Sequence, residues 1–477
     1  MYTLKNPIIP GFYPDPSICR DEKTGDFYLV TSSFEFFPGV PIFRSRDLVH
    51  WEQIGHCLTR ESQLPLKNAH ASGGIYAPTI RYHDGIFYMV TTNVSGGGHF
   101  FVTATDPAGE WSEPVWIRGD GIDPSLFFDD NGKVYFSWTD YGMKQAEINI
   151  KTGELGEIRP IWCGTGGRNA EAPHLYKIDG KYYLLLAEGG TETGHMVTIA
   201  RADTPWGPFE SCPHNPILSN RHAYVATQAT GHGDLICDEK GKWWMVFLAF
   251  RMTKPYFHHL GRETFLVPID WENDWPVVKN YTNCPANCGT VDTKMEISRE
   301  IIEHIYEKNP SRSDFSKISF DWVYVRNPDF SKYSAKNGVL TLESGATTIS
   351  DPLGSPTFLL RRQRAFDVCV GTKLSAQLPA EGAETGISVY YDHAHHYDLF
   401  LTRRNEKTYA VVRKTVGDIV AEVFCRELEE ATAELFIRSD AEKYFFILNG
   451  EEIATGLTQY VSTEATVCSF TGVLIGI

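Results

Sequence analysis

The sequence predicts an all-β protein in which a β-propeller is followed by a β-sandwich. A short phrase recurs five times in the first part of the 477-residue chain, and it opens on an ionisable residue in four copies. An aromatic run follows each copy after seven to nine residues. Beyond about residue 320, short alternating strands continue without this repeat. These observations indicate repeated sheet units and then a second all-β domain.

The spacing of the five copies favours repeated sheets over helical repeats. Their closing Ile or Leu residues lie between 46 and 62 residues apart, which is longer than an ankyrin or tetratricopeptide unit. The copies bring two aspartates, a glutamate and a histidine to similar positions. They are Asp15-Pro-Ser-Ile18, Tyr76-Ala-Pro-Thr-Ile80, Asp123-Pro-Ser-Leu126, Glu171-Ala-Pro-His-Leu175 and His232-Gly-Asp-Leu235.

Each phrase is the predicted first strand of a propeller blade, and each aromatic run is the predicted second strand. Glycines in the turns between them, such as Gly85 and Gly180, supply the positive φ that a tight hairpin needs. Because blades lie radially around a shared axis, residues at the same place in the first strands converge there. The aromatic runs are Phe27–Val30, Phe87–Val90, Val134–Ser137, Tyr182–Leu185 and Trp243–Val246.

The repeat does not extend over the whole chain, which is long enough to require a second domain. We expect the propeller over residues 1–285, a linker over 286–318 and a β-sandwich over 319–477. Within the linker, apolar residues recur with helical spacing and predict a short helix over 297–307. Short alternating strands separated by turns predict the sandwich.

Charge and composition exclude some partners. The formal net charge of −16 argues against nucleic acid, whose phosphates require a basic surface. No run of 18 apolar residues is present, so no membrane span is expected. Met1 is not followed by the apolar core of a signal peptide, so we expect a cytoplasmic protein whose ten cysteines are reduced. A homo-oligomer is compatible with the sequence.

Three of the converging residues are carboxylic acids with different neighbours. Asp15 and Asp123 each precede Pro-Ser, whereas Glu171 lies among small and apolar residues. A single Asp-Pro-Ser is typical of a turn or cap, but its recurrence in equivalent strands favours a functional role. Burial of Glu171 would keep its carboxyl protonated near neutrality. Cleavage of a glycosidic bond requires one protonated and one ionised carboxyl.

Seven segments carry a resemblance to a known family. They are Asn6–Ser17, Ser33–Gly39, Ser45–Trp51, Gly74–Pro78, Glu171–Leu175, Ala187–Gly190 and Gly261–Thr264. In this order they resemble glycoside hydrolase family 43, the β-xylosidase and α-L-arabinofuranosidase group, over nearly the whole chain. The resemblance implies a five-bladed propeller, a concanavalin-like C-terminal sandwich and an inverting, exo-acting hydrolase that removes terminal xylose or arabinose from hemicellulose oligosaccharides.

The resemblance also implies a role for each acid. Asp15 would be the general base that activates water, Glu171 the general acid, and Asp123 the residue that orients Glu171 and favours its protonated form. Because inversion needs space for a water between base and sugar, we expect the carboxyl groups of Asp15 and Glu171 to lie roughly 6.5 to 9.5 Å apart. The expected partners are short xylo- or arabinoxylo-oligosaccharides.

Three further residues are expected to bind the sugar. Phe34 and Tyr76 would form walls of the pocket, although an aromatic residue in a propeller more often belongs to the core. Many relatives carry Trp at the position of Tyr76, which changes the shape of the first sugar subsite. Arg262 corresponds to an arginine that reaches the active site of relatives, where its fork could grip hydroxyls or the base. Its alternative is an ion pair with Glu263 at the surface.

His232 occupies the equivalent position in the fifth copy. A lone histidine is more often a hydrogen-bonded core residue than a ligand, but in relatives this residue lies on the propeller axis, often beside calcium and its waters. One expectation is therefore a structural calcium, held weakly, because calcium prefers six to eight oxygen ligands. No cofactor is expected for the chemistry. The cluster His393-Ala-His-His396 lacks matched acidic or Cys partners in the sequence pattern, so no metal is expected there.

Two other functions stay open on the sequence alone. A retaining fructosidase of the invertase type shares the architecture, but its Asn-Asp-Pro, Arg-Asp-Pro and Glu-Cys signatures are absent. A carbohydrate-binding propeller without catalysis is the other, because a fold does not determine a function. Such a scaffold has no need for Asp, Asp and Glu at matched axial positions.

Overall fold

A computed structural model describes residues 1–253, 256–282, 284, 286–301, 313, 315–466 and 469–477. Its regular structure is almost entirely β-strand. Among these residues the helices are three short 3₁₀ turns, η1 (Phe330–Lys332), η2 (Thr458–Val461) and η3 (Thr463–Ala465). None of the helices in the described residues is long and apolar enough to cross a membrane.

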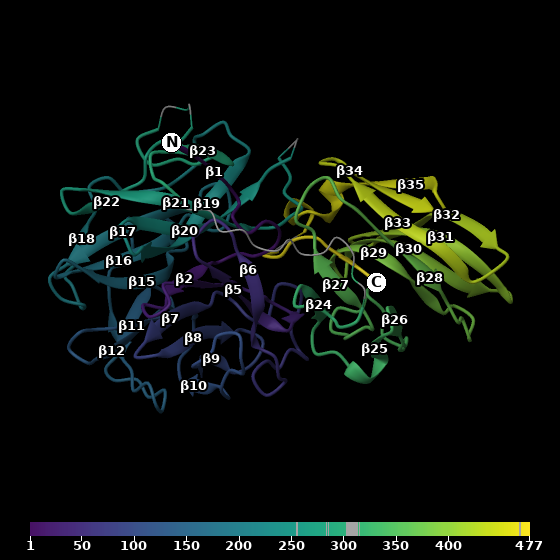
Figure 1. Cartoon of the computed structure of the whole chain (residues 1–477), viewed down its shortest axis with the longest axis horizontal. Coiled ribbons are helices and arrows are strands. Elements are labelled where there is room, and N and C mark those ends of the chain that lie inside the picture. Colours follow the sequence, from purple (N-terminus) through teal and green to yellow (C-terminus); the bar gives the residue numbers. More distant parts are fainter. Residues whose placement is uncertain (254–255, 283, 285, 302–312, 314, 467–468) are drawn as a thin grey trace. The chain divides into compact units, whose positions relative to one another are not determined.

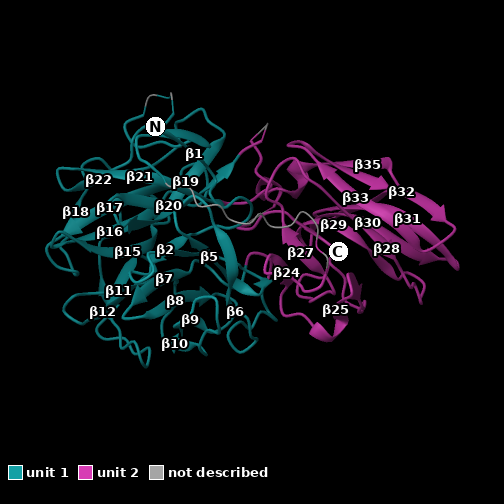
Figure 2. Ribbon diagram, in the orientation of Figure 1, with its two compact units in different colours: residues 1–69, 73–251, 263–310 teal, residues 70–72, 252–262, 311–477 magenta. Residues whose placement is uncertain are grey.

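The chain divides into two compact units, which Figure 2 shows in different colours. Unit 1 holds the recurring phrases, and unit 2 holds most of the C-terminal part. Two short segments that come earlier in the chain also belong to unit 2. Unit 1 consists of Met1–Ala69, Gly73–Arg251 and Glu263–Pro310, and unit 2 of His70–Ser72, Met252–Arg262 and Ser311–Ile477.

Most of the described strands of unit 1 form five four-stranded antiparallel sheets (Figure 1). In spatial order the first is β2 (Ser17–Arg20), β3 (Phe27–Val30), β5 (Gly39–Ser45) and β6 (Glu52–Leu58), and the second is β7 (Thr79–His83), β8 (Ile86–Asn93), β9 (Gly98–Ala104) and β10 (Val115–Ile117). The third is β11 (Ile122–Phe128), β12 (Val134–Thr139), β13 (Met143–Glu147) and β14 (Arg159–Pro160). The short strand β4 (Phe36–Phe37) lies between β3 and β5 in the chain.

The last two sheets follow the same pattern. The fourth is β15 (Glu171–Ile178), β16 (Lys181–Glu188), β17 (Met196–Ala202) and β18 (Glu210–Ser211), and the fifth is β19 (Thr227–Cys237), β20 (Trp243–Arg251), β21 (Glu263–Glu272) and β22 (Trp275–Val277). Each phrase thus enters the first strand of a sheet, and each aromatic run lies in the second. The strand positions therefore agree with the repeat in the sequence.

The five first strands form a closed ring. β2 contacts β7, β7 contacts β11, β11 contacts β15, β15 contacts β19, and β19 contacts β2. Four-stranded sheets whose first strands surround a common axis are the blades of a β-propeller. The predicted propeller class is therefore confirmed.

The strands of unit 1 are held by apolar residues on both faces of each blade. All four residues of β3 are buried, as are Trp244, Met245, Val246 and Phe247 in β20. Side chains of the first, fourth and fifth blades share one core cluster. This burial explains why the aromatic runs are continuous rather than alternating, because each blade is covered by a neighbour on either side.

The end of unit 1 differs from the predicted linker. β23 (Lys294–Ile297) lies within residues 286–318 and pairs antiparallel with β1 (Tyr2–Lys5). Met295 and Ile297 are buried in the same core as Leu4, whereas the residues between them are exposed. This alternation with a period of two is what a half-buried strand requires. The predicted helix over 297–307 begins at the last residue of β23, and most of its length lies outside the described residues.

Unit 2 is a β-sandwich. In its larger sheet the order is β32 (Ile419–Leu428), β31 (Lys407–Val416), β30 (His395–Arg404), β29 (Glu384–Asp392), β36 (Leu474–Gly476), β27 (Leu359–Arg362) and β24 (Trp322–Val325). The smaller sheet is β28 (Cys369–Ser375), β33 (Thr432–Ser439), β34 (Lys443–Leu448) and β35 (Glu451–Leu457), and a separate hairpin is β25 (Tyr333–Lys336) and β26 (Val339–Leu342). Residues of both sheets, such as Leu399 and Ile437, share one buried core, so the two sheets pack face to face. The predicted sandwich is confirmed.

Candidate active site

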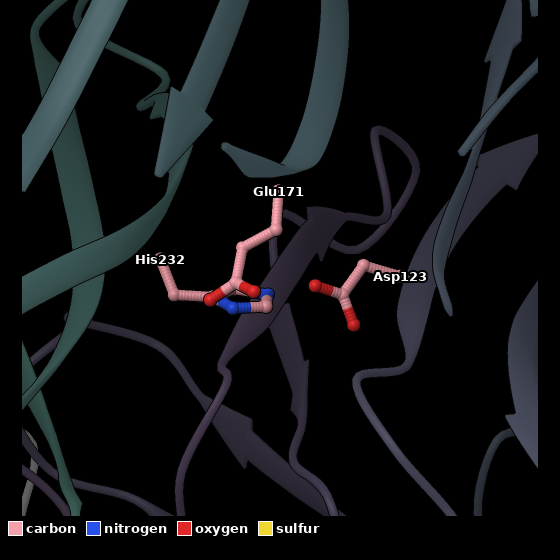
Figure 3. Close-up of side chains that lie close together, drawn as sticks. All are labelled: Asp123, Glu171 and His232. Atoms are coloured by element: carbon pink, nitrogen blue, oxygen red, sulfur yellow. The ribbon is translucent and has the colours of Figure 1, made fainter. Parts of the chain in front are cut away.

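The first strands of the propeller bring four of the predicted site residues to the axis. Asp15 lies just before β2, Asp123 lies in β11, Glu171 opens β15 and His232 lies in β19. One ligand atom from each of Asp123, Glu171 and His232 lies within 4.8 Å of the others. Figure 3 shows the two carboxyl groups and the imidazole pointing toward one another. Residues up to 109 positions apart in the sequence thus meet at one point.

Asp15 joins this cluster through His232. Its Oδ1 lies 3.7 Å from Nδ1 of His232, and its Oδ2 accepts a hydrogen bond of 2.5 Å from the hydroxyl of Ser32. The side chain of Asp15 is buried, with 4% of the residue exposed, whereas Glu171 is half-buried. The two candidate proton-transfer residues therefore differ in access to solvent.

An unusual backbone conformation sets the direction of these side chains. Asp15, Asp123 and His232 have φ of 54°, 54° and 50°, and in the fourth blade the corresponding residue is Ala172, with φ of 55°. The left-handed region is unfavourable for non-glycine residues by roughly 1–2 kcal/mol. Such strain persists where the surrounding structure imposes it, often at functional sites.

The position of the left-handed residue explains why Glu171 comes one residue earlier in its phrase than the aspartates do. The pairing of β11 with β12 shifts register between Ile122 and Ser125, and the pairing of β15 with β16 shifts between Glu171 and His174. A bulge of this kind re-aims a side chain. Asp123 lies inside its bulge, whereas Glu171 precedes its own. The longer side chain of Glu171 thus reaches the axis from a different backbone position.

The segment that leads to Asp15 is held by a buried ion pair. Oε1 of Glu263 accepts a hydrogen bond of 2.7 Å from the backbone N–H of Gly11. The guanidinium of Arg251 donates hydrogen bonds to both carboxylate oxygens of Glu263, at 2.7 and 2.8 Å. The hydroxyl of Thr264 donates to the carbonyl of Tyr13 at 2.7 Å. The start of β21 therefore anchors the chain just before the candidate base.

The segment that leads to Glu171 is held by a different buried carboxylate, Glu188 at the end of β16. Glu188 accepts hydrogen bonds from the backbone N–H groups of Thr165 (2.8 Å) and Gly167 (2.7 Å) and from the hydroxyl of Thr198 (2.6 Å). A Cβ added to Gly164 would lie 2.4 Å from Oε1 of Glu188. The loop therefore passes so close to this carboxylate that position 164 requires glycine.

The two aromatic residues predicted to contact the sugar lie next to each other in unit 1. The rings of Phe34 and Tyr76 lie 5.4 Å apart, and Phe12 stacks on Phe34 at 5.8 Å. Phe34 is almost fully buried, whereas Tyr76 is half-buried. Tyr76 therefore offers more of its surface to a ligand, with Phe34 packed against it. Their contact with sugar stays a prediction.

Arg262 belongs to unit 2. It is buried, its Nη2 donates to the carbonyl of Phe470 at 3.2 Å, and its guanidinium lies 5.4 Å from the ring centroid of Phe470. Glu263 pairs with Arg251 and is fully buried, so the alternative of a surface pair between Arg262 and Glu263 is wrong. The predicted role of Arg262 in binding sugar stays a prediction.

A second ring of polar residues lies one step further along the first strands. The residue before the closing Ile or Leu is polar and buried in all five phrases: Ser17, Thr79, Ser125, His174 and Asp234. Ser125 donates to the carbonyl of Pro173 in the next blade at 2.5 Å, and Thr79 donates to that of Pro124 at 2.9 Å. This shared polarity was visible in the sequence and could have predicted the ring.

Asp234 and His174 have strongly shifted pKa values. Burial opposes ionisation of Asp234, but the guanidinium of Arg81 outweighs it and holds the pKa of this carboxyl far below its usual range. Burial lowers the pKa of His174 to about 3. His174 is therefore neutral at physiological pH, and Asp234 is ionised.

The histidine cluster of unit 2 belongs to no group of three candidate metal ligands among the described residues. His395 pairs with Asp392 at 2.9 Å and His396 pairs with Asp398 at 3.0 Å. The expectation that acidic partners are lacking was wrong, because Asp392 meets His395 across the turn between β29 and β30, and Asp398 lies two residues after His396 on β30. They form separate pairs, and the described residues contain no group of three ligands there. The nine described cysteines are free thiols.

Comparison with known proteins gives matches over the whole chain. The family model described as Glycosyl hydrolases family 43 matches residues 4–276, and that of the beta xylosidase C-terminal concanavalin A-like domain matches residues 312–477. A non-reducing end α-L-arabinofuranosidase of Bacteroides ovatus is 42% identical, over 99% of this chain and 90% of the relative. A xylosidase/arabinosidase of Butyrivibrio fibrisolvens is 38% identical, over 100% and 96%. The crystal structure of a xylan β-1,4-xylosidase from Bacillus halodurans superposes with a TM-score of 0.91 at 34% identity, over 99% and 96%.

Proposed function

The chain belongs to glycosyl hydrolase family 43, and we propose that it removes terminal α-L-arabinofuranosyl and β-D-xylosyl residues from hemicellulose oligosaccharides with inversion. The observation that carries this proposal is the meeting of Asp15, Asp123, Glu171 and His232 at the propeller axis. Relatives that match nearly the full chain carry both activities in their names. The reaction of a glycoside hydrolase requires carboxyl groups of this kind.

Glu171 is the proposed general acid. It stands half-buried at the start of β15, where its carboxyl faces that of Asp123. It donates its proton to the glycosidic oxygen as the bond to the terminal sugar breaks. The negative charge of Asp123 favours the protonated form of Glu171 between turnovers, because two adjacent carboxylates repel each other.

Asp15 is the proposed general base. It takes a proton from a water molecule, which attacks the anomeric carbon from the face opposite the leaving group. The hydroxyl of Ser32 donates to Oδ2 of Asp15, and the imidazole of His232 lies 3.7 Å from Oδ1, so the base is oriented before the substrate arrives. Preorganisation of this kind avoids a cost during the reaction. Tyr76, backed by Phe34, is the proposed contact to the terminal sugar in unit 1.

The test compares hydrolysis of an aryl β-xyloside and an aryl α-arabinofuranoside and follows the anomer of the first product by NMR. We expect both glycosides to be cleaved and the configuration to be inverted. A retained configuration would contradict the roles of Asp15 and Glu171. A folded protein that cleaves neither glycoside would contradict the proposed substrates and favour a carbohydrate-binding function.

A further inference from the structure

A buried carboxylate, Asp234, lies directly beyond the proposed catalytic residues. It is two residues past His232 on β19 and fully buried. Its Oδ2 accepts from the hydroxyl of Ser17 (2.7 Å), the backbone N–H of Ile18 (3.1 Å) and Nη1 of Arg81 (2.8 Å). Its Oδ1 accepts from the hydroxyl of Tyr176 (2.5 Å) and from Nη2 of Arg81 (3.3 Å). Asp234 thus connects β19 to β2, β7 and β15.

Arg81 is the positive partner in this ring. It follows the closing Ile80 of the second phrase, and besides Asp234 its Nη2 contacts Nδ1 of His174 at 2.9 Å. A guanidinium can only donate hydrogen bonds, so Nδ1 of His174 accepts and its proton lies on Nε2. Its Nη1 also donates to the hydroxyl of Ser17 at 3.2 Å, so one guanidinium links four of the five first strands.

These contacts bear on the calcium that the family resemblance implied for the axis. An ionised carboxylate has about four lone-pair sites, and five hydrogen bonds already use those of Asp234. Nδ1 of His174 is occupied by Arg81, and its Nε2 carries a proton. Neither residue has a lone pair left for a cation, and the charge of Arg81 would repel one.

In the described part of the chain, the axis holds one group of three candidate ligand side chains, and all three are proposed catalytic or supporting groups. Asp123, Glu171 and His232 supply two carboxylates and one imidazole, whereas calcium prefers six to eight oxygens. A cation bound directly to Glu171 would also replace the proton that this residue is proposed to donate. The donor set at the axis therefore does not fit a resident calcium.

We propose that Arg81 is the cation of the propeller axis and that its pair with Asp234 positions the catalytic ends of the first strands, so that the protein needs no divalent metal. Ser17 and Asp234 lie two residues from Asp15 and His232 on the same strands. The contact between Ser17 and Asp234 therefore also restrains Asp15 and His232. A planar guanidinium that donates to two partners fixes both the distance and the angle between them. A hydrated metal ion, which acts as a point charge, does not.

The first experiment measures the thermal midpoint of the wild-type protein after treatment with a chelator, and then with millimolar CaCl₂. We expect the two midpoints to agree within about 1 °C, because a cation that binds only the folded state would raise the midpoint by several degrees at a hundredfold excess over its Kd. A saturable rise of that size would overturn the proposal. The thermal midpoint can be measured without a substrate.

The second experiment compares Tyr176→Phe with its matched control Tyr182→Phe. Each tyrosine lies on the fourth blade and donates to a buried aspartate, Tyr176 to Asp234 and Tyr182 to Asp129 at 2.9 Å. Asp129 lies past the far end of β11, six residues from Asp123, which is roughly 20 Å along an extended strand. The two variants thus lose a similar hydrogen bond at different distances from the site.

We expect Tyr176→Phe to lower kcat about tenfold with little change in KM. The free energy of a hydrogen bond to a charged group corresponds to about that factor. Tyr182→Phe is expected to keep kcat within about twofold. Equal kcat values for the two variants would overturn the positioning role, whatever their stabilities. The comparison of kcat values rests on the proposed function. Failure of that function and failure of the inference give different results. A wild-type protein that cleaves neither glycoside refutes the function, whereas an active protein that a chelator inactivates and calcium restores refutes the inference.

Discussion

The segments that enter β2 and β15 start from the same repeated phrase and deliver carboxyl groups of different character. In the first, Asp15 itself is left-handed and buried. In the second, Ala172 takes the left-handed position, and Glu171 precedes it at a half-buried site. A shift of one residue relative to the left-handed position therefore suffices to separate an enclosed carboxyl from an accessible one. A repeat can supply several acids, and local backbone geometry makes them unlike.

The two segments are also anchored by different chemistry. The chain before Asp15 is tied to Glu263, whose charge is balanced by Arg251. The chain before Glu171 wraps around Glu188, whose hydrogen bonds come from backbone N–H and hydroxyl groups. When an ion pair loses one partner, a buried charge remains without compensation. When neutral donors lose their acceptor, the loss of folding free energy is smaller. The variants below test this difference.

The largest effects are expected at the two acids. Glu171→Gln should lower kcat/KM roughly 10²- to 10⁴-fold for a natural oligosaccharide, but much less for a dinitrophenyl glycoside, whose leaving group needs no proton. Asp15→Asn should lower the rate for both substrates alike, because water must still be activated. Steady-state kinetics on the two substrates with each variant measures this. A similar loss on both substrates for Glu171→Gln would show that it is not the acid.

Removing the anchor of the β2 segment should cost the most stability. Glu263→Ala leaves the guanidinium of Arg251 without its buried partner, so we expect a loss of about 3–5 kcal/mol in the free energy of unfolding. Glu52→Ala is the control, because Glu52 pairs with Arg44 at the surface and such pairs contribute about 0–1 kcal/mol. Urea denaturation measures both. Equal losses would mean that the Glu263 pair is not an anchor.

The anchor of the β15 segment can be tested with two glycines of one loop. Gly164 and Gly166 have φ of +87° and +98°, but an added Cβ meets Glu188 only at Gly164, while Gly166 has nothing within 4 Å. Both alanine variants should lose roughly 1–2 kcal/mol from the left-handed backbone. Gly164→Ala should lose roughly 1–3 kcal/mol more through overpacking and should also lower kcat. Denaturation and kinetics that fail to separate the two variants would contradict the role of Glu188.

The smallest effect is expected from the hydroxyl that holds Asp15. Ser32→Ala removes a hydrogen bond of 2.5 Å to the carboxylate, and we expect kcat/KM to fall about tenfold, as for loss of a bond to a charged group. Ser137→Ala is the control, since its buried hydroxyl donates to the neutral amide of Gln145 at 2.8 Å. It should cost about 1 kcal/mol of stability and leave the rate unchanged. Unchanged kinetics for Ser32→Ala would show that Asp15 is held by other contacts.

Prediction from sequence succeeded where a feature repeats locally. The phrases placed Asp15, Asp123, Glu171 and His232 on or next to first strands and near a common axis, since strand period and turn residues are properties of short segments. It failed for β23, whose four residues become a strand only because β1, nearly 300 residues earlier, offers an edge. It also missed Arg81, because an isolated arginine after an apolar residue has no distinctive local pattern.

The sequence by itself determined the class of fold, the family and the set of acids at the axis, because these follow from repeated local patterns. The tertiary structure decided which acid is buried, which residues hold each one, and which arginine pairs with Asp234. Ser17 and Asp234 are 217 residues apart and 2.7 Å from each other. Closure of the ring of blades creates such contacts, and no local property of either segment encodes them.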